Sequence, residues 1–305
     1  FRATGLSTFS SLSLSLSSGS HLVCSLVHRH PDWRIINLDN VSLHCDCSDL
    51  LCNSKWYTSL FPRQGDVCNS RLVNHIFSTE SIDVIFHLAA KTHVESSFEC
   101  PSSFQHVNID GTGILLGAAH QARHQLQRFI YVSTDEVYGA GVEQVFDESS
   151  PLRPSNPYSA TKAAAEYLVR SYWDQYKFPI IITRSNNIYG PRHTIQGTLP
   201  KSQIYNVGTT CEIPIVQLAR ELVTMVSLVT AVNDWLEFVP DRLSVELRYP
   251  IKCEKLQQLG WRAQVSWAEG IRQTVKWYQR NPDFWPDTSE DQKPTREEAG
   301  HHPRI

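Results

Sequence analysis

Short apolar runs rich in β-branched residues alternate along the chain with longer segments in which apolar residues recur every three or four positions. The short runs are almost continuously apolar, which is typical of parallel strands covered by helices on both faces. They predict strands over residues 34–39, 83–90, 128–134 and 179–185. The longer segments predict helices over residues 21–29, 69–79, 102–123, 157–177, 214–229 and 266–279. We therefore expect an α/β fold built on a Rossmann-like, doubly wound parallel sheet, with a smaller carboxy-terminal lobe.

The charge and cysteine content narrow the classes of function. The 305-residue chain carries a net charge of −3, so we expect no basic surface for nucleic acid or an anionic membrane. No apolar run reaches the length of about eighteen residues that predicts a transmembrane helix. The eight cysteines have no regular framework spacing, which indicates reduced thiols in a cytoplasmic protein. His44, Cys45, Cys47 and Cys52 lie close together, but their spacing is a poor match to structural zinc, so no metal is expected.

Two neighbouring acids, Asp135 and Glu136, directly follow the third predicted strand. In an open parallel sheet, ligands bind beyond the carboxyl ends of the strands, which is where these acids fall. Asp39, residues 89–90 and the turn 185–191 end the other predicted strands and reach the same edge. The acids either cap an ordinary turn or act as acid and base of a reaction. The second interpretation requires the strand to end by Asp135, because adjacent strand residues point to opposite faces.

The helix predicted after this strand opens with the sequence NPYSATKAAAE, which places Tyr158 and Lys162 four residues apart on one helix face. A free tyrosine has a pKa near 10, so it needs help to act as a base at neutral pH. An ammonium about 4 Å away contributes about 4 kcal/mol at an effective dielectric constant near 20, which corresponds to a pKa about three units lower. The spacing alone is better explained by a solvated tyrosine and lysine. Its position after the strand that carries Ser133 and Thr134 favours chemistry.

Four segments, HLAAKTHV, VSTDEVYG, NPYSATKAAAE and RSNNIYGP, occur in an order and at a spacing that resembles the extended short-chain dehydrogenase/reductase family. Within that family, the chain is most similar to the dTDP-glucose 4,6-dehydratases. The resemblance covers about residues 21–200 and resumes over residues 204–281. It implies an NAD-dependent hydro-lyase whose substrate is the sugar nucleotide dTDP-glucose. UDP-glucose dehydratases share the TDE sequence, so the nucleobase stays open.

The resemblance also implies roles for the residues of the site. As NAD takes hydride from C4 of the glucose, Tyr158 would remove the O4 proton, with Lys162 beside it and Thr134 orienting the hydroxyl. Glu136 would then remove the C5 proton while a protonated Asp135 donates to the departing C6 hydroxyl. Hydride returns to C6, which gives the 4-keto-6-deoxy sugar. One acid must be charged and its neighbour neutral, which a difference in environment can produce.

Binding residues follow from the same resemblance, position by position. The ribose of NAD is expected at Asp39 and its adenine at Asp66. The cofactor set as a whole comprises Asp39, Asp66, Val67, Leu88, Ala89, Ala90, Thr92, Tyr158 and Lys162. The expected substrate contacts are Thr92, Thr134, Asn187, Arg248 and Tyr249. The helices at 102–123 and 157–177 resemble the pair through which members of the family form homodimers.

The chain departs from the family in two places. Where the family has a strand and a glycine-rich turn, the sequence reads SLSLSLSSGSHLV, in which only Gly19 remains near the turn. A central strand here would bury Ser13 and Ser15 against helices. After GPRHTIQGTLPK the family continues for several dozen residues, whereas this chain passes from Lys201 almost directly to Ile204. A wall of the substrate lobe is therefore expected to be missing.

These departures set the expected domain boundaries. They are an aberrant amino-terminal segment at 1–20, an NAD-binding Rossmann-like domain at 21–200, a truncated sugar-nucleotide lobe at 201–285 and a disordered tail at 286–305. They also leave two alternatives open. One is a catalytically impaired isoform that acts as a dimerising or binding protein. The other is a different NAD-linked sugar-nucleotide enzyme such as an epimerase, against which Asp135 argues.

Overall fold

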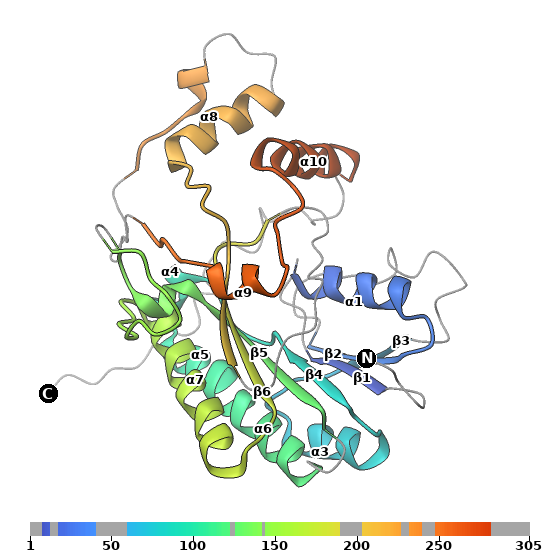
Figure 1. Ribbon diagram of the computed structural model, residues 1–305. Helices are drawn as coiled ribbons and strands as arrows, with labels where there is room; N and C mark the ends of the chain where they lie inside the picture. Colours follow the sequence, from blue (N-terminus) through green and yellow to red (C-terminus); the bar gives the residue numbers. More distant parts are fainter. Residues whose placement is uncertain are drawn as a thin grey trace, which may run out of the picture.

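A seven-stranded parallel sheet forms the centre of the computed structural model (Figure 1), with strand order β3-β2-β1-β4-β5-β6-β7. The structure describes residues 8–12, 18–40, 60–122, 126–141, 144–189, 203–226, 232–239 and 248–281. The strands are β1 (Thr8–Leu12), β2 (Arg34–Asp39), β3 (Leu60–Gln64), β4 (Val84–His87), β5 (Arg128–Thr134), β6 (Ile180–Ser185) and β7 (Gln203–Val207). Each neighbouring pair runs parallel. The expected doubly wound α/β sheet is confirmed.

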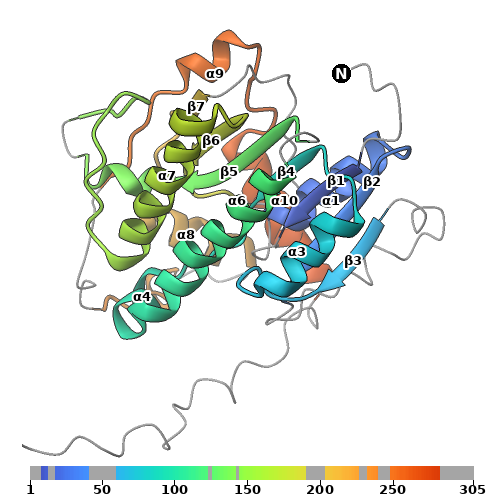
Figure 2. The same cartoon turned by 90° about the horizontal axis from the view of Figure 1, so that it is seen from below.

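Helices cover both faces of this sheet. One face carries α3 (Ser70–Thr79), α6 (Gly111–Gln121) and α7 (Pro157–Tyr176), which lie side by side in Figure 2. The opposite face carries α1 (Ser18–Arg29) and the short α9 (Glu254–Gln258). Shorter elements are α4 (Val94–Glu99), α5 (Pro101–Gln105), η1 (His106–Asp110), η2 (Asp135–Tyr138) and η3 (Val232–Trp235). The lobe above the sheet in Figure 1 consists of α8 (Ile215–Val226) and α10 (Trp267–Arg280).

Alternation along the strands divides the apolar residues between the two faces. Ile180 and Ile182 pack in the larger core with α6 and α7, whereas Ile181 between them packs with Leu256 of α9 on the other side. Successive strand residues point to opposite faces, so a continuous apolar run serves both layers. Each fully buried Ile or Phe contributes about 1.5–3 kcal/mol relative to exposure. This two-sided burial explains why β2, β4, β5 and β6 were recognisable from sequence.

Two predicted elements differ in detail. The helix expected over residues 102–123 is the run α5–η1–α6, in which a π-helical turn interrupts two α-helical segments while the backbone stays helical. The strand expected over residues 83–90 pairs only from Val84 to His87. Residues 88–90 leave the sheet and follow its carboxyl edge. A strand that ends early frees these residues for the rim where ligands bind.

The expected boundaries of the main domain need correction at both ends. The expected aberrant segment 1–20 contains β1, which pairs with β2 and β4 in the middle of the sheet, and α1 begins at Ser18. Parallel pairing is made by backbone groups, and β1 ends at Leu12, before Ser13 and Ser15. The expected lobe 201–285 contains β7, which extends the sheet beside β6. Ser13, Ser15 and the tail 286–305 lie outside the described residues.

The part of the chain that the structure describes contains no helix long and apolar enough to cross a membrane. The same residues contain no group of three or more His, Cys, Asp or Glu side chains placed to hold a metal ion. The cluster of His44, Cys45, Cys47 and Cys52 lies outside them.

Candidate active site

The two neighbouring acids lie on a tight turn where β5 ends. Thr134 is the last residue of the strand, and its Oγ1 accepts a hydrogen bond from the backbone N–H of Glu136 at 3.2 Å. Adjacent residues of a strand point to opposite faces of the sheet. The 3₁₀ turn η2 starts at Asp135, so this alternation does not apply to the two acids. The turn ends at Gly139, whose φ of 79° and closeness to the Arg153 carbonyl leave no room for a side chain.

The two acids have different surroundings. Asp135 is 4% exposed, and its Oδ2 accepts from Asn186 Nδ2 at 2.5 Å while its Oδ1 accepts from Thr134 Oγ1 at 3.2 Å. Burial raises the pKa of Asp135 to about 7, helped by the nearby Glu136 charge and opposed by the hydrogen bonds from Asn186 and Thr134. Glu136 is less buried, and its Oε2 accepts from Asn156 Nδ2 at 3.1 Å. The site thus separates a carboxyl held near neutrality from one stabilised by an amide donor.

Asn186 meets Asp135 because of the register of the sheet. Thr134 pairs with Ser185, and Ser185 pairs with Val207, so the residues after these three strand ends lie side by side. The Asn186 amide also donates to the Tyr249 carbonyl at 3.2 Å, and its backbone N–H bonds to Val207. Sequence reasoning missed this residue, although three strands that end together predict such a meeting.

Tyr158 and Lys162 lie in the first turns of helix α7, which packs against β5 and the turn of the acids. It begins with a capping box in which Asn156 and Ser159 exchange hydrogen bonds, followed by Pro157 in the first turn. Tyr158 is 7% exposed and Lys162 is 3% exposed. The Lys162 Nζ donates to the Val132 carbonyl at 2.7 Å, which joins the helix to β5.

The expected lowering of the Tyr158 pKa by Lys162 is wrong for this arrangement. Burial raises the pKa of Tyr158, and the Glu136 and Asp135 charges raise it further, against a hydrogen bond with Thr134 that lowers it. Burial also lowers the pKa of Lys162 to about 7, although the Glu166 charge opposes this. These surroundings favour the protonated phenol, so proton removal by Tyr158 would need a further positive charge, which the nicotinamide ring of NAD would supply.

The predicted cofactor residues fall on the rim formed by the ends of β2, β3 and β4. Asp39 ends β2 and is 7% exposed, and Asp66 turns its Oδ1 onto the Cys68 backbone N–H at 2.8 Å. Three predicted contacts, Val67, Leu88 and Ala89, are buried, Ala90 is half-buried and Thr92 is exposed. β2 and β4 flank β1 and β4 pairs with β5, so this rim continues into the turn that carries the acids.

The described residues fit the two ends of an NAD molecule. The Asp39 carboxylate is an acceptor suited to ribose hydroxyls at the end of β2. Near the acids, the Ser133 Oγ is buried, and no residue of the described chain bonds to it. Lys162 adds a buried ammonium whose described side-chain bond is to one carbonyl. Residues 13–17, where the family has its glycine-rich turn, lie outside the described part.

The predicted substrate residues are more dispersed. Asn187 is exposed, one position beyond the asparagine that meets Asp135. Arg248 is paired with Glu212 through bonds of 2.7 and 2.9 Å, with side chains 44% and 50% exposed. The Tyr249 carbonyl is joined to Asn186, so this residue is tied to the acids through its backbone. Thr134 is the predicted substrate contact that lies among the predicted catalytic residues.

A buried polar network behind the acids was not predicted. Arg184 of β6 binds Glu166 of α7, with Nη2 to Oε2 at 2.6 Å, and donates from Nη1 to the Tyr138 hydroxyl at 2.8 Å. Tyr138, the last residue of η2, donates to Asn206 of β7 at 2.7 Å. The network therefore links the turn of the acids to the helix of Tyr158 and to two strands. Its members come from four separate segments, so no local pattern reveals it.

Another buried asparagine, Asn108, is linked to the Tyr158 backbone through Thr161. Asn108 of η1 exchanges hydrogen bonds with the backbone of Lys91 at 2.8 and 3.0 Å and donates to Thr161 Oγ1 at 2.9 Å. Thr161 in turn donates to the Tyr158 carbonyl at 2.7 Å. The loop after β4 and the π-helical turn η1 are thus both joined to the first turns of α7.

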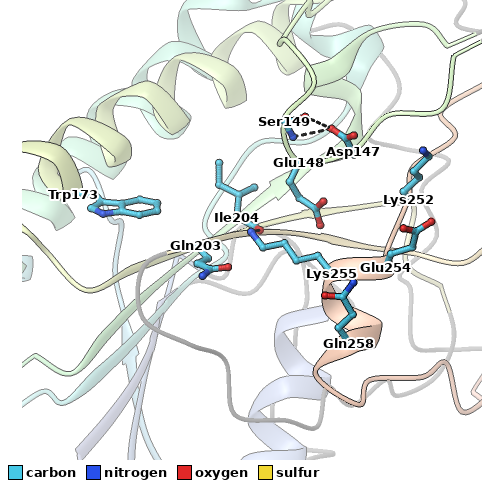
Figure 3. A pocket seen from close by; sticks show the side chains of 10 residues that line it. All are labelled: Asp147, Glu148, Ser149, Trp173, Gln203, Ile204, Lys252, Glu254, Lys255 and Gln258. Carbon is cyan, nitrogen blue, oxygen red and sulfur yellow. Dashed lines mark hydrogen bonds between the residues drawn. The ribbon is translucent and has the colours of Figure 1, made fainter.

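A hollow beside β7 lies apart from the acids (Figure 3). Its lining includes Glu148 and Lys255, and Figure 3 shows the Lys255 side chain reaching toward Ile204. The Lys255 Nζ donates to the Ile204 carbonyl at 2.7 Å, and Glu148 Oε1 accepts from the Asn206 backbone N–H at 2.9 Å. These side chains satisfy backbone groups of an edge strand, which protects it against pairing with another chain. We assign this hollow no catalytic role.

Comparison with known proteins identifies the family to which the chain belongs. A family model described as GDP-mannose 4,6 dehydratase matches residues 18–212. This chain belongs to that dehydratase family. The dTDP-D-glucose 4,6-dehydratase of Homo sapiens is 40% identical over 313 positions, covering 87% of this chain and 88% of the human protein. Because 313 positions exceed the 305 residues of the chain, the human dehydratase has residues within the match that this chain lacks.

Other members of the dehydratase family agree. A trifunctional UDP-glucose 4,6-dehydratase/UDP-4-keto-6-deoxy-D-glucose 3,5-epimerase/UDP-4-keto-L-rhamnose-reductase of Arabidopsis thaliana is 35% identical, covering 88% of this chain and 46% of that protein. Among solved structures, DesIV, a dTDP-glucose 4,6-dehydratase from Streptomyces venezuelae crystallised with NAD, is 28% identical. It matches with a TM-score of 0.79 and covers 91% of this chain and 99% of its own.

Proposed function

We propose that this chain is a dTDP-glucose 4,6-dehydratase, which uses NAD to convert dTDP-glucose into dTDP-4-keto-6-deoxy-glucose and water. The observation that carries the proposal is the pair of unlike carboxyls, Asp135 and Glu136, on a turn where the Thr134 hydroxyl bonds to both residues. Relatives of this activity are 40% identical to the chain, which supports the same assignment.

The residues of the site divide the reaction among them. NAD, when bound, supplies the acceptor for hydride from C4 and the donor of hydride to C6. Tyr158 takes the proton from the O4 hydroxyl, and Thr134 orients that hydroxyl. Glu136 removes the C5 proton and later returns it, while Asp135 donates a proton to the C6 hydroxyl as water leaves. Lys162 holds α7 against β5 through its bond to the Val132 carbonyl, and its ammonium lies over the Tyr131 ring.

The environments of the acids support these roles. Burial holds the pKa of Asp135 at about 7, so a large fraction is protonated at neutral pH and able to donate. Glu136 accepts from the Asn156 amide, which favours a carboxylate able to act as a base. Exchange of the two roles would require the more buried acid to carry the charge.

The proposal extends to the substrate and cofactor contacts. Asp39, Asp66 and Val67 hold the adenosine end of NAD, and Leu88, Ala89, Ala90 and Thr92 line its pyrophosphate. Asn187, Arg248 and Tyr249 bind the sugar nucleotide. We assign dTDP rather than UDP because the dTDP-specific relatives are more similar to the chain than the Arabidopsis protein is. Epimerases with solved structures are at most 23% identical among those compared and share the fold alone.

We also propose a cytoplasmic homodimer that pairs through α5–α6 and α7. Tyr167 and Tyr176 of α7 are 58% and 46% exposed, which is consistent with a helix face available to a second copy. Light scattering at several concentrations tests the dimer. Replacing Tyr167 with aspartate is expected to favour the monomer, because a charge buried in an interface lacks a partner. An unchanged mass for the variant contradicts this interface.

The activity is tested directly with purified protein, NAD and dTDP-glucose. We expect a 4-keto-6-deoxy product, detected by mass spectrometry and by the absorbance of the keto sugar in alkali. Replacing Glu136 with glutamine is expected to reduce turnover by about 10²–10⁴-fold and to leave sugar-nucleotide binding intact, because only the base is lost. Equal turnover by the variant refutes the role of Glu136. Folded protein that binds NAD and forms no product supports the alternative of a catalytically impaired binding protein.

A further inference from the structure

Asn186 follows β6 and lies half-buried beside the turn of the acids. Its backbone N–H bonds to the Val207 carbonyl at 3.1 Å, which continues the pairing of β6 with β7. Its side-chain Nδ2 donates to Asp135 Oδ2 at 2.5 Å and to the Tyr249 carbonyl at 3.2 Å. The residue therefore joins three segments that are distant in the sequence.

The Tyr249 carbonyl determines which way the Asn186 amide faces. A carbonyl can only accept, so the atom that meets it must be the NH2 group of the amide. One N–H is then used on Tyr249 and the other on Asp135 Oδ2. A flipped amide would place its oxygen against the Tyr249 carbonyl, where neither atom can donate. The side chain thus has one orientation, and in that orientation it donates to Asp135.

Gly208, which follows β7, makes room for this side chain. A Cβ at that position would overlap Asn186 Oδ1 and would lie 2.8 Å from Asn186 Cγ. Side chains do not approach this closely, so an alanine at 208 would displace the amide. Asn186 is therefore fixed on its oxygen side by the Gly208 backbone and on its nitrogen side by Asp135 and Tyr249.

We propose that Asn186 is a positioning residue that orients the Asp135 carboxyl, so that Oδ2 accepts a hydrogen bond and Oδ1 carries the acidic proton. The role rests on the proposed function, in which Asp135 donates a proton to the departing C6 hydroxyl. The carbonyl oxygen of a protonated carboxyl is its stronger acceptor, so an N–H donor at Oδ2 favours the proton on Oδ1. Thr134 Oγ1 lies 3.2 Å from Oδ1 and, as a hydroxyl, can donate to the carboxylate or accept from the acid.

Asn186 also favours the ionised form of Asp135. Burial raises the pKa of Asp135 to about 7, and the bond from Asn186 is the largest influence that lowers it. The titratable groups around this carboxyl are Glu136 from the same turn, Tyr158 from α7 and Cys253 before α9. The Glu136 charge raises the Asp135 pKa. Loss of the amide donor therefore leaves burial and a like charge acting in the same direction.

Two variants remove this support in different ways. Replacing Asn186 with leucine keeps the shape of the side chain and removes both N–H donors. Replacing Gly208 with alanine keeps Asn186 and displaces its amide. The matched control is G117A, because a Cβ at Gly117 meets no other part of the protein within 4 Å. The infrared band of the protonated Asp135 carboxyl, assigned by its loss in D135N, is followed against pH in the full chain.

In N186L the midpoint of this titration is expected to rise by about one to two pH units, which is the effect of one hydrogen bond to a charged group. The band is expected to move to higher frequency, because the carbonyl loses a hydrogen bond. G208A should change both in the same direction by a smaller amount, and G117A should change neither. An unchanged midpoint or an unchanged band in N186L overturns the inference. If N186L does not fold, as checked by circular dichroism, G208A decides by the same criteria.

Turnover with NAD and dTDP-glucose separates this role from the proposed function. N186L is expected to turn over about 100-fold more slowly, because a catalytic group that is out of position loses about that factor. The alkaline limb of its pH profile should move to higher pH together with the Asp135 midpoint, since the acid keeps its proton for longer. Slower turnover with an unmoved limb overturns the positioning role and keeps the dehydratase. A wild type that forms no product overturns the dehydratase, and the infrared titration then decides the role of Asn186 by itself.

Discussion

Two arginine–glutamate pairs of similar geometry lie in opposite surroundings. Arg184 and Glu166 are 2% and 0% exposed between β6 and α7, whereas Arg248 and Glu212 are 44% and 50% exposed in the carboxy-terminal region. In both pairs the guanidinium makes two or more bonds to one carboxylate. The buried pair is held because either partner alone would be an uncompensated charge, while water and salt weaken the exposed one.

The difference matches what each pair supports. The buried pair continues through Tyr138 into the turn that carries Asp135 and Glu136, so the position of the two acids proposed for catalysis depends on it. In the exposed pair, Glu212 binds Arg248, the residue that we propose to close over the nucleotide. A weakly held arginine can exchange its partner for a phosphate, whereas a catalytic turn must stay in place. Both pairs join an arginine to a glutamate, and the difference in burial makes the first pair rigid and the second able to change partners.

The largest expected effect is at the buried pair. Replacing Glu166 with glutamine leaves the Arg184 charge buried without a counter-charge, and we expect the free energy of unfolding to fall by about 3–5 kcal/mol. Urea unfolding followed by circular dichroism measures the change. The same substitution at Glu212 is the matched control. Similar losses in E166Q and E212Q contradict the distinction between the pairs.

Among the described residues, Asp135 is a buried acid without a cationic partner, in contrast to Glu166. Asp135 is as buried as Glu166 but is bonded to neutral groups, and burial raises its pKa from 3.8 to about 7. The folded state then binds this proton more tightly than the unfolded state. Its contribution to stability is complete below about pH 4 and is lost as the pH rises to about 7, a loss of about 4 kcal/mol.

Replacing Asp135 with asparagine is expected to remove this loss. The stability of D135N relative to wild type should therefore grow between about pH 4 and pH 7 and stay constant above it. Urea midpoints measured across this range test the sign, and the comparison at each pH cancels the contribution of Lys162. A difference that does not change with pH shows that the Asp135 pKa is not raised.

An intermediate effect is expected at Tyr138, which connects the buried pair to the acids. Its hydroxyl accepts from Arg184 and donates to Asn206. Replacing it with phenylalanine removes a hydrogen bond to a charged group, and we expect a loss of about 1.5–3 kcal/mol in unfolding free energy. Turnover is expected to fall as well, because the turn loses its anchor. Replacing Tyr205 with phenylalanine is a control in β7, since its hydroxyl bonds only to Gln203 among the described contacts. Full activity in Y138F contradicts the anchoring role.

Local patterns explain which parts of this arrangement were predictable. The apolar runs of β2, β5 and β6 could be predicted as strands because both faces of each strand are buried. The spacing of Tyr158 and Lys162 predicted one helix face, and the helix is there. Asp135 and Glu136 were placed at the rim because a strand ends directly before them.

Long-range contacts explain what was not predictable. An amino-terminal strand was doubted because it would bury Ser13 and Ser15, yet β1 lies earlier, over Thr8–Leu12, and pairs on both sides in the centre of the sheet. Asn186 reaches Asp135 only through the register of β5 with β6. The pKa of Tyr158 was expected to fall, and burial beside two acids raises it. Each depends on segments distant in sequence, whose approach no local spacing encodes.

The smallest expected effect is at the exposed pair. Replacing Glu212 with glutamine removes a bond that water already screens, so we expect the urea midpoint to stay within error of wild type, and any difference at low ionic strength to vanish at high salt. The same variant frees Arg248 from its partner, which should tighten binding of dTDP, measured by calorimetry, because the guanidinium no longer has to leave a carboxylate. Replacing Arg248 with glutamine is expected to weaken dTDP binding instead. If E212Q destabilises the protein as much as E166Q does, then Arg248 is a structural residue and its proposed exchange of partners is wrong.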